Sequence, residues 1–220
     1  MRTLIKRSLN LVTQILMLPL AITCWLETGL NPKGELVFGF WAHCLALFPG
    51  LPGVFLRRGF YSLTLTKCSL NCHIGFGSFF VHRDSVIADN VYIGNYCTLG
   101  SAQIGKNALV GSHACLLSGS EQHQRDEQTG QWLPFNHSGM RQITLAENVW
   151  IGESAVLMAD IGEGSVVGAG SVVGTAVKAN VVVAGNPARF VRQLPVPLNG
   201  AETPDDDALN HVELAAGAKK

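Results

Sequence analysis

The chain has 220 residues, the length of one ordinary domain, and its 16 basic and 16 acidic side chains give a formal net charge of zero. This balance excludes a protein whose surface is strongly basic or acidic, so we expect no nucleic acid partner. Charged residues make up only 15% of the chain and glycines number 24, which favours a fold with frequent tight turns over a highly solvated chain.

Residues 1–60 form an apolar segment with two long hydrophobic stretches. Residues 9–26 are preceded by basic residues, and residues 36–56 end in Arg57 and Arg58. Each stretch approaches the roughly 20 residues that cross a bilayer, but proline or polar residues interrupt both. Basic residues at both outer ends favour a helical hairpin with cytoplasmic termini, or two helices in the membrane interface. A soluble helical cap that packs on the first coil of a repeat fold is the alternative.

The membrane interpretation also predicts where the protein resides. No small-residue cleavage motif follows the first apolar stretch, so we do not expect a cleavable signal peptide. The six cysteines are scattered rather than arranged as a disulfide framework, which favours reduced core residues. We therefore expect the protein on the cytoplasmic side of the inner membrane, or otherwise in the cytoplasm.

The sequence changes character at Tyr61, and we expect a β-helical domain over residues 61–194. Residues 61–66, YSLTLT, alternate polar and apolar side chains and predict a strand. Further along, an aliphatic residue followed by glycine keeps returning, with a small residue four positions after the aliphatic one. The clearest copies begin at Ile151, Ile161 and Val167, and the small residues are Ala155, Ser165 and Ser171. A six-residue period fits neither an amphipathic helix nor a two-faced strand, and it predicts a parallel β-helix of stacked hexapeptides.

Two segments lack this repeat. Residues 119–142 form a predicted excursion loop that carries charged residues, a tryptophan and the histidines His123 and His137. A loop of about two dozen residues inside a compact repeat indicates function or disorder. Residues 195–220 contain an acidic run and no apolar periodicity, so we expect a disordered tail and assign it no role.

Two motifs near the end of the repeat carry a resemblance to a known family. Residues 168–173, GAGSVV, and residues 184–189, AGNPAR, resemble the hexapeptide-repeat acyltransferases. More closely, roughly residues 70–192 resemble the O-acetyltransferases of sugars and surface polysaccharides. The resemblance implies a left-handed parallel β-helix of triangular section, assembled as a homotrimer with acetyl-CoA bound between subunits. It also implies an acceptor hydroxyl on a sugar, a polysaccharide or a lipid-linked precursor.

The resemblance assigns residues to the acyl donor. Glycines around Ala169 let the pantetheine arm lie against bare backbone, and guanidinium groups suit the phosphates of the nucleotide. Relatives often carry Thr-Lys after the SVV segment, but Gly174 and Thr175 follow it here, so Lys178 is the candidate replacement. The predicted donor-binding residues are Trp150, Gly168, Ala169, Gly170, Lys178, Arg189 and Arg192. For the arginines a solvated surface is the alternative, and for Trp150 packing against the excursion loop.

Acetyl transfer to a hydroxyl also needs a base, most often a histidine, because its pKa lies close to the working pH. In the resembling enzymes this histidine follows the coil that ends here at Gly119, and we expect His123 to be the base. Three residues separate it from Gly119, more than in many relatives, so His137 and His113 stay as alternatives. Asn95 matches loosely a position near the acceptor, and a corner asparagine is the alternative.

Two rival functions remain open. A catalytically silent β-helix that scaffolds a membrane assembly would share the fold but would not bind CoA. A γ-class carbonic anhydrase also has a β-helix, but the paired histidines that hold its metal are absent here. Cys68, Cys72 and His73 lie close together without a matching second pair, so we expect no metal site.

Overall fold

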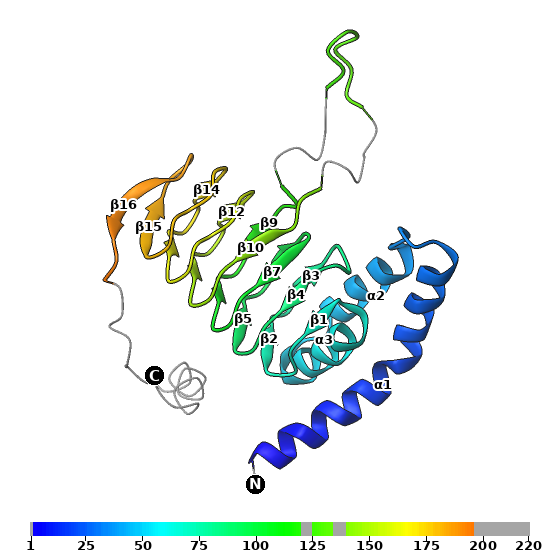
Figure 1. Cartoon of the computed structure of the whole chain (residues 1–220). Coiled ribbons are helices and arrows are strands. Elements are labelled where there is room, and N and C mark those ends of the chain that lie inside the picture. The colour runs from blue at the N-terminus through cyan, green and yellow to red at the C-terminus, as the bar shows by residue number, and fades with distance from the viewer. Residues whose placement is uncertain (1, 120–124, 134–139, 196–220) are drawn as a thin grey trace.

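The structure, a computed structural model, describes residues 2–119, 125–133 and 140–195. A helical cap precedes a parallel β-helix of about six turns (Figure 1). The cap consists of α1 (Arg2–Leu30), α2 (Leu36–Ala46) and α3 (Gly50–Thr64). The predicted fold class, a β-helix of hexapeptide repeats with an apolar helical segment in front of it, is confirmed.

Short strands form the three faces of the β-helix. The first face contains β1 (Lys67–Cys68), β4 (Val86–Ile87), β7 (Ala102–Ile104) and β10 (Ile143–Leu145). The second face contains β2 (Cys72–Ile74), β5 (Val91–Ile93), β8 (Leu109–Val110), β11 (Trp150–Ile151), β13 (Val166–Val167), β15 (Val181–Ala184) and β16 (Arg189–Gln193). The third face contains β3 (Phe79–Phe80), β6 (Thr98–Leu99), β9 (Cys115–Leu116), β12 (Val156–Leu157) and β14 (Val172–Val173). Neighbouring strands on each face are parallel, except that β16 runs antiparallel to β15.

The chain turns between faces at three corners. The first corner joins the first face to the second, and the second corner joins the second face to the third; the latter includes residues 94–97, 111–114 and 168–171. The third corner joins the third face to the first and includes residues 81–85 and the excursion loop between β9 and β10. Because parallel strands lie about 4.8 Å apart, residues at one corner of successive coils are separated by about that distance.

Glycine sets the spacing of the coils at the point where they approach most closely. A Cβ added to Gly152 would lie 2.4 Å from the backbone nitrogen of Ala169 in the next coil. The aliphatic residue before each such glycine points inward, and the interior is a continuous apolar stack. On the second face the fully buried members of this stack are Ile74, Ile93, Val110, Ile151 and Val167. The six-residue repeat of an aliphatic residue followed by glycine therefore reflects one inward side chain and one close backbone contact per strand.

A buried guanidinium joins the cap to the first coil. The Arg57 side chain on α3 is fully buried, and its Nη1 donates to the carbonyl oxygens of Leu45 at 3.0 Å and Phe48 at 2.8 Å. Its Nε donates to the carbonyl oxygen of Ile74 on β2 at 2.9 Å. The C-terminal carbonyls of a helix have no partners within the helix, so this arginine satisfies the end of α2 and links it to the β-helix.

The predicted strand over residues 61–66 is wrong, because α3 continues to Thr64. The Tyr61 ring is buried against Phe80, and its hydroxyl accepts the Phe80 N–H at 3.2 Å. The Thr64 hydroxyl donates to the carbonyl oxygen of Phe60 within the helix at 2.9 Å. Packing against the first coil therefore decides the structure of this segment, because an alternating pattern over so few residues is compatible with a helix as well as a strand.

The second apolar stretch, residues 36–56, forms two helices rather than one. It divides into α2 and α3 at Pro49 and Gly50, and Gly50 has a positive φ of 64°. Among the described residues, one helix is long and apolar enough to cross a membrane, over Lys6–Leu30 of α1. The predicted tail, residues 195–220, lies outside the described residues except for Pro195.

The stacking contact can be tested with Gly152→Ala. The added methyl group forces two coils apart, so we expect a loss of about 1–3 kcal/mol in the free energy of unfolding, measured by chemical denaturation. Gly174→Ala is the matched control, because its Cβ would meet nothing closer than Met158 Cε at 3.9 Å. Equal stability of the two variants would contradict this account of the glycine.

Candidate active site

The glycine-rich segment Gly168–Gly170 forms the second corner between β13 and β14. Gly170 has a positive φ of 65°, a backbone conformation that other residues adopt only with strain. The N–H of Gly168 donates to the carbonyl oxygen of Val183, and that of Gly170 to the carbonyl oxygen of Glu153, both at 2.8 Å. Ala169 and Gly170 are exposed. This corner therefore presents rigid backbone and a single methyl group to solvent.

Two arginines lie beside this corner on β16. Arg189 pairs with Ala184, which packs against Gly168 of the adjacent coil, and Arg192 pairs with Val182 farther along the second face. Both guanidinium side chains are exposed, and among the described residues neither forms an ion pair with a carboxylate. Such cations are available to an anionic group that approaches the corner.

Trp150 lies on the same side of the molecule. It is on β11, paired with Val166 of β13, and its side chain is 56% exposed on the outer surface of the second face. The structure therefore places Trp150 on β11, the segment Gly168–Gly170 after β13 and Arg189 on β16 in one part of the second face, where the strand order is β11, β13, β15 and β16. The resemblance assigned all of these residues to the donor: Trp150, Gly168, Ala169 and Gly170 on the coils, and Arg189 on the edge strand β16.

Two other predicted residues lie apart from this group. Lys178 is at the first corner, where its carbonyl oxygen accepts the Ser165 hydroxyl at 2.7 Å. Asn95 is at the second corner, but three coils from Gly168–Gly170, a separation of about 14 Å at the usual strand spacing. Its Oδ1 accepts the N–H of Phe76 at 2.9 Å, so the side chain ties two early coils together.

The candidate base has no described position. His123 and His137 lie outside the described residues, so the assignment of either as base stays a prediction. His113 is an exposed second-corner residue with a positive φ of 62°, and its ring stacks on Tyr96 with the centroids 5.3 Å apart. Its place is therefore that of a corner residue.

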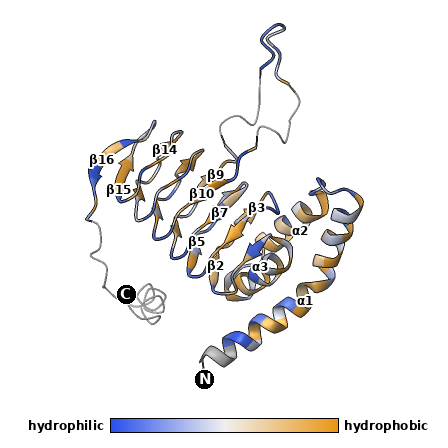
Figure 2. Cartoon of the chain, in the orientation of Figure 1, coloured by the Kyte–Doolittle hydropathy of each residue, from blue (hydrophilic) through white to orange (hydrophobic). Residues whose placement is uncertain are grey.

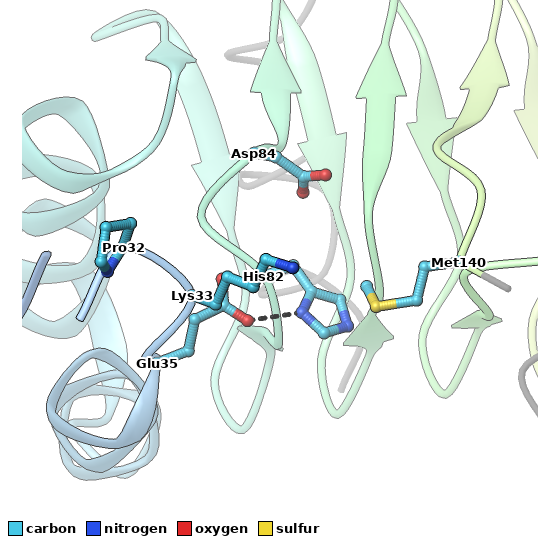
Figure 3. A pocket seen from close by; sticks show the side chains of 6 residues that line it. All are labelled: Pro32, Lys33, Glu35, His82, Asp84 and Met140. Carbon is cyan, nitrogen blue, oxygen red and sulfur yellow. Dashed lines mark hydrogen bonds and ion pairs between the residues drawn. The ribbon is translucent and has the colours of Figure 1, made fainter. Parts of the chain in front are cut away.

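A pocket at the third corner was not predicted. It has a volume of about 300 Å³ and is lined by Pro32, Lys33, Glu35, His82, Asp84 and Met140 (Figure 3). Within it His82 Nδ1 lies 2.6 Å from Glu35 Oε2. No local pattern in the sequence relates His82 to Glu35, which is 47 residues away.

The Glu35 carboxylate is held in its ionised form. Burial alone would raise its pKa, but the hydrogen bonds from His82 and from the backbone N–H of Arg83 outweigh burial and hold the pKa below its ordinary value. The Arg83 N–H lies 2.8 Å from Oε1, so each carboxylate oxygen has its own donor. An acidic group fixed in this way orients the imidazole that it contacts.

No cluster of three or more His, Cys, Asp or Glu side chains suited to a metal occurs among the described residues. The Cys68 and Cys72 sulfur atoms lie 4.0 Å apart, and the cysteines of the chain are free thiols. The hydrogen bond with the neighbouring thiol of Cys72, and then burial, raise the pKa of Cys68 well above its ordinary value, so Cys68 is a packed thiol rather than a metal ligand.

Comparison with known proteins shows similar sequences among acetyltransferases, although no family model matches the chain. The chain is 32% identical over 127 residues to the galactoside O-acetyltransferase of Escherichia coli. The matched region covers 56% of this chain and 55% of that protein. The chain thus spans about half the length of that relative. It is 29% identical over 168 residues to a putative colanic acid biosynthesis acetyltransferase of Escherichia coli, with coverages of 70% and 85%.

A solved structure shares the fold. A galactoside acetyltransferase in complex with coenzyme A superimposes with a TM-score of 0.60 at 24% sequence identity, covering 73% of this chain and 81% of that one. The chain is thus similar in sequence to named acetyltransferases and shares the parallel β-helical fold of a galactoside acetyltransferase, in agreement with the resemblance that its hexapeptide repeat carries.

Proposed function

We propose that the protein is an acetyltransferase that moves the acetyl group of acetyl-CoA to a hydroxyl of a sugar, within a polysaccharide or lipid-linked precursor. The observation that carries this proposal is the group formed by Trp150 on β11, Gly168–Gly170 after β13 and Arg189 on β16, in one part of the second face. Relatives named for galactoside and for colanic acid biosynthesis support the sugar acceptor. The shared fold with a coenzyme A complex supports the donor.

The chemistry of each part fits this transfer. The exposed backbone at Ala169 and Gly170 suits the amide groups of the pantetheine arm, because no bulky side chain covers it. Arg189 and Arg192 suit the phosphates of the nucleotide. Trp150 offers an apolar surface one strand away, where the acetyl thioester or the arm can pack. Lys178 lies at a different corner, so any contact it makes with the donor involves a different subunit.

Assembly follows from the positions of these groups. The donor-binding residues lie at the second corner, whereas the excursion loop that carries His123 leaves from the third corner. The third face separates these corners within one chain, so we infer that the loop meets the donor of a neighbouring copy in a homotrimer. Exposed apolar side chains on the second face support such contacts between subunits. They are Tyr92, Leu109, Trp150, Phe190 and Val191.

The cap has the surface expected of a protein that lies on a membrane. Hydrophobic residues run along much of α1 (Figure 2), and many are exposed. The exposed members are Leu9, Leu11, Val12, Ile15, Leu16, Leu18, Ile22, Trp25, Leu26 and Leu30. An apolar surface of this extent is uncommon on a soluble monomer. We infer that α1 contacts the cytoplasmic surface of a membrane.

The contacts of α1 favour the interface over a transmembrane span. Near its start, Lys6 Nζ donates to Asn71 Oδ1 at 2.6 Å. Near its end, Arg83 Nη1 donates to the carbonyl oxygen of Cys24 at 3.2 Å. Both ends are thus attached to the first coil, and a helix crossing the bilayer would carry these polar coil residues into hydrocarbon. We propose that α1 lies along the membrane surface.

Arg189→Ala tests donor binding. Loss of a charge-assisted hydrogen bond of about 1.5–3 kcal/mol should raise the KM for acetyl-CoA about 10–100-fold. The kcat at saturating donor should change little, because the phosphates lie far from the reacting carbon. Lys106→Ala removes an exposed cation from the first corner and should leave KM unchanged. A normal KM in Arg189→Ala would exclude Arg189 from the donor site.

The homotrimer is tested by light scattering of the full chain in mild detergent. We expect the mass of three chains, because the donor group and the excursion loop of one chain face different neighbours. A stable monomer that still transfers acetyl groups from acetyl-CoA would show that one chain holds a complete site.

The membrane surface is tested by flotation with vesicles that contain anionic phospholipid. Ile15→Glu combined with Ile22→Glu places charge on the exposed face of α1, and bound protein should fall more than about tenfold, since each buried aliphatic side chain contributes about 1.5–3 kcal/mol. Thr175→Glu with Ala176→Glu adds equal charge at exposed β-helix positions and should bind as wild type. Unchanged flotation of the α1 variant would rule out this face.

A further inference from the structure

A second apolar surface lies on α2 and on the turn that follows it. Residues 47–52 (LFPGLP, the elbow) lie at the junction of α2 and α3, and all of them are exposed. The exposed large hydrophobic side chains of α2 and the elbow are Leu36, Phe40, Leu47, Phe48 and Leu51. Leu36, Phe40 and Leu47 recur at helical spacing, so they share one side of α2. An apolar surface of this kind indicates contact with another apolar phase or molecule.

This surface adjoins the apolar side of α1. Trp41 Nε1 on α2 donates to the Thr23 hydroxyl of α1 at 3.0 Å, and this contact is exposed. The Trp41 ring also meets that of Phe40, with the centroids 4.9 Å apart. Thr23 follows Ile22, one of the exposed residues of α1. The two helices therefore present one apolar surface, and the elbow extends it beyond the end of α2.

The N-terminal end of α2 has its backbone groups paired by a side chain of α1. The first N–H groups of a helix have no partner within the helix, and water supplies one at a solvated end. Here the Glu27 carboxylate accepts the N–H of Val37 at 2.9 Å and that of Phe38 at 3.3 Å. The next N–H, of Gly39, donates to the carbonyl oxygen of Glu35 at 2.9 Å. Consecutive donors at this end thus have partners inside the cap.

The C-terminal end of α2 and the elbow are paired in the same way. Arg57 Nη1 donates to the carbonyl oxygens of Leu45 and Phe48. The carbonyl oxygen of Ala46 accepts the N–H of Gly77 in the first coil at 2.8 Å. Prolines within the elbow remove further backbone donors. Backbone at membrane depth needs such internal partners because hydrocarbon offers none, so this pairing suits an elbow that leaves water.

The length of α2 limits how far this surface reaches into a bilayer. Its 11 residues extend about 16 Å, whereas the hydrocarbon core is about 30 Å thick, so α2 does not cross it. The polar loop before α2 carries Lys33, which is exposed and forms no ion pair among the described residues. Such a cation suits the level of the phospholipid headgroups. After the elbow, α3 returns into the protein, where Phe60 and Tyr61 are fully buried.

We propose that the elbow inserts into the acyl chains of one leaflet of a phospholipid bilayer, as a re-entrant anchor beside α1. This inference rests on the proposed membrane contact of α1, and it adds the depth of the anchor and the residues that form it. The loop that carries Lys33 stays among the headgroups, and α2 leads the elbow toward the acyl chains. Because insertion removes apolar side chains from water, attachment through the elbow needs neither anionic lipid nor low salt.

Binding to neutral vesicles separates insertion from electrostatic attraction. The full chain is mixed with phosphatidylcholine vesicles in about 1 M salt, where the Debye length falls to about 3 Å. Leu47→Ser combined with Phe48→Ser should lower the partition coefficient more than about tenfold, because two apolar side chains lose the gain from burial. Trp132→Ser with Leu133→Ser is the matched control, since it removes two exposed apolar side chains from the excursion loop and should bind as wild type.

The depth of the elbow is measured by fluorescence quenching with phospholipid that is brominated on its acyl chains. Phe48→Trp places an indole in the elbow, and the emission that it adds should be quenched by these vesicles. Thr175→Trp places an indole at an exposed position of the β-helix, and its added emission should stay unquenched. This measurement removes no second apolar side chain, so it decides the proposal even where the serine variant fails to fold.

The outcomes separate this anchor from the proposed contact of α1. Wild-type protein that binds neither neutral nor anionic vesicles would overturn both. Binding that is lost in Ile15→Glu with Ile22→Glu but unchanged in the serine variant of the elbow, with Phe48→Trp unquenched, would overturn the anchor alone. If the serine variant binds vesicles as wild type but forms a smaller assembly by light scattering, the elbow is a contact between copies of the chain and the proposal fails.

Discussion

The arrangement of the molecule depends on two arginines buried between the helical cap and the first coil. Arg57 and Arg58 have no carboxylate within ion-pair distance in the described part of the chain, and burial lowers the pKa of each. Backbone carbonyls take the place of a counter-ion, and each such hydrogen bond to a charged group contributes about 1.5–3 kcal/mol. Because the carbonyls come from the end of α2 and from β2, the guanidinium of Arg57 fixes the orientation of the cap. The loop that carries Glu35 is placed as a consequence.

The β-helix then converts sequence order into three stacked corners. Residues at one corner of successive coils lie a strand spacing apart, whatever their separation in sequence. Gly168–Gly170 and Arg189 thereby share the second corner, while His82 and the excursion loop share the third. In our proposal a neighbouring copy brings the donor residues and the excursion loop together, and the apolar side of α1 keeps the chain at a membrane surface. This arrangement would suit a lipid-linked acceptor.

The sequence predicts the structure best where its physical signal is periodic. The aliphatic-glycine repeat predicted the β-helix because each coil needs one inward aliphatic side chain and one close backbone approach, as at Ile151 and Gly152. The prediction from sequence failed at residues 61–66, where a short alternating segment continues α3 because Tyr61 packs beneath Phe80. Proline interrupts the apolar pattern of residues 36–56, and the structure divides this stretch into α2 and α3 at Pro49 and Gly50.

The sequence by itself determined the class of fold, the resemblance to the hexapeptide-repeat acyltransferases and the segments proposed to hold the donor, because these depend on residues that are neighbours or repeat at a fixed spacing. Tertiary structure alone decided which residues meet across the junction of cap and coil. Glu35 and His82 are 47 positions apart, on a loop and a corner that no pattern relates. Their contact exists because buried arginines set the cap against the first coil, and such long-range packing leaves no local trace in the chain.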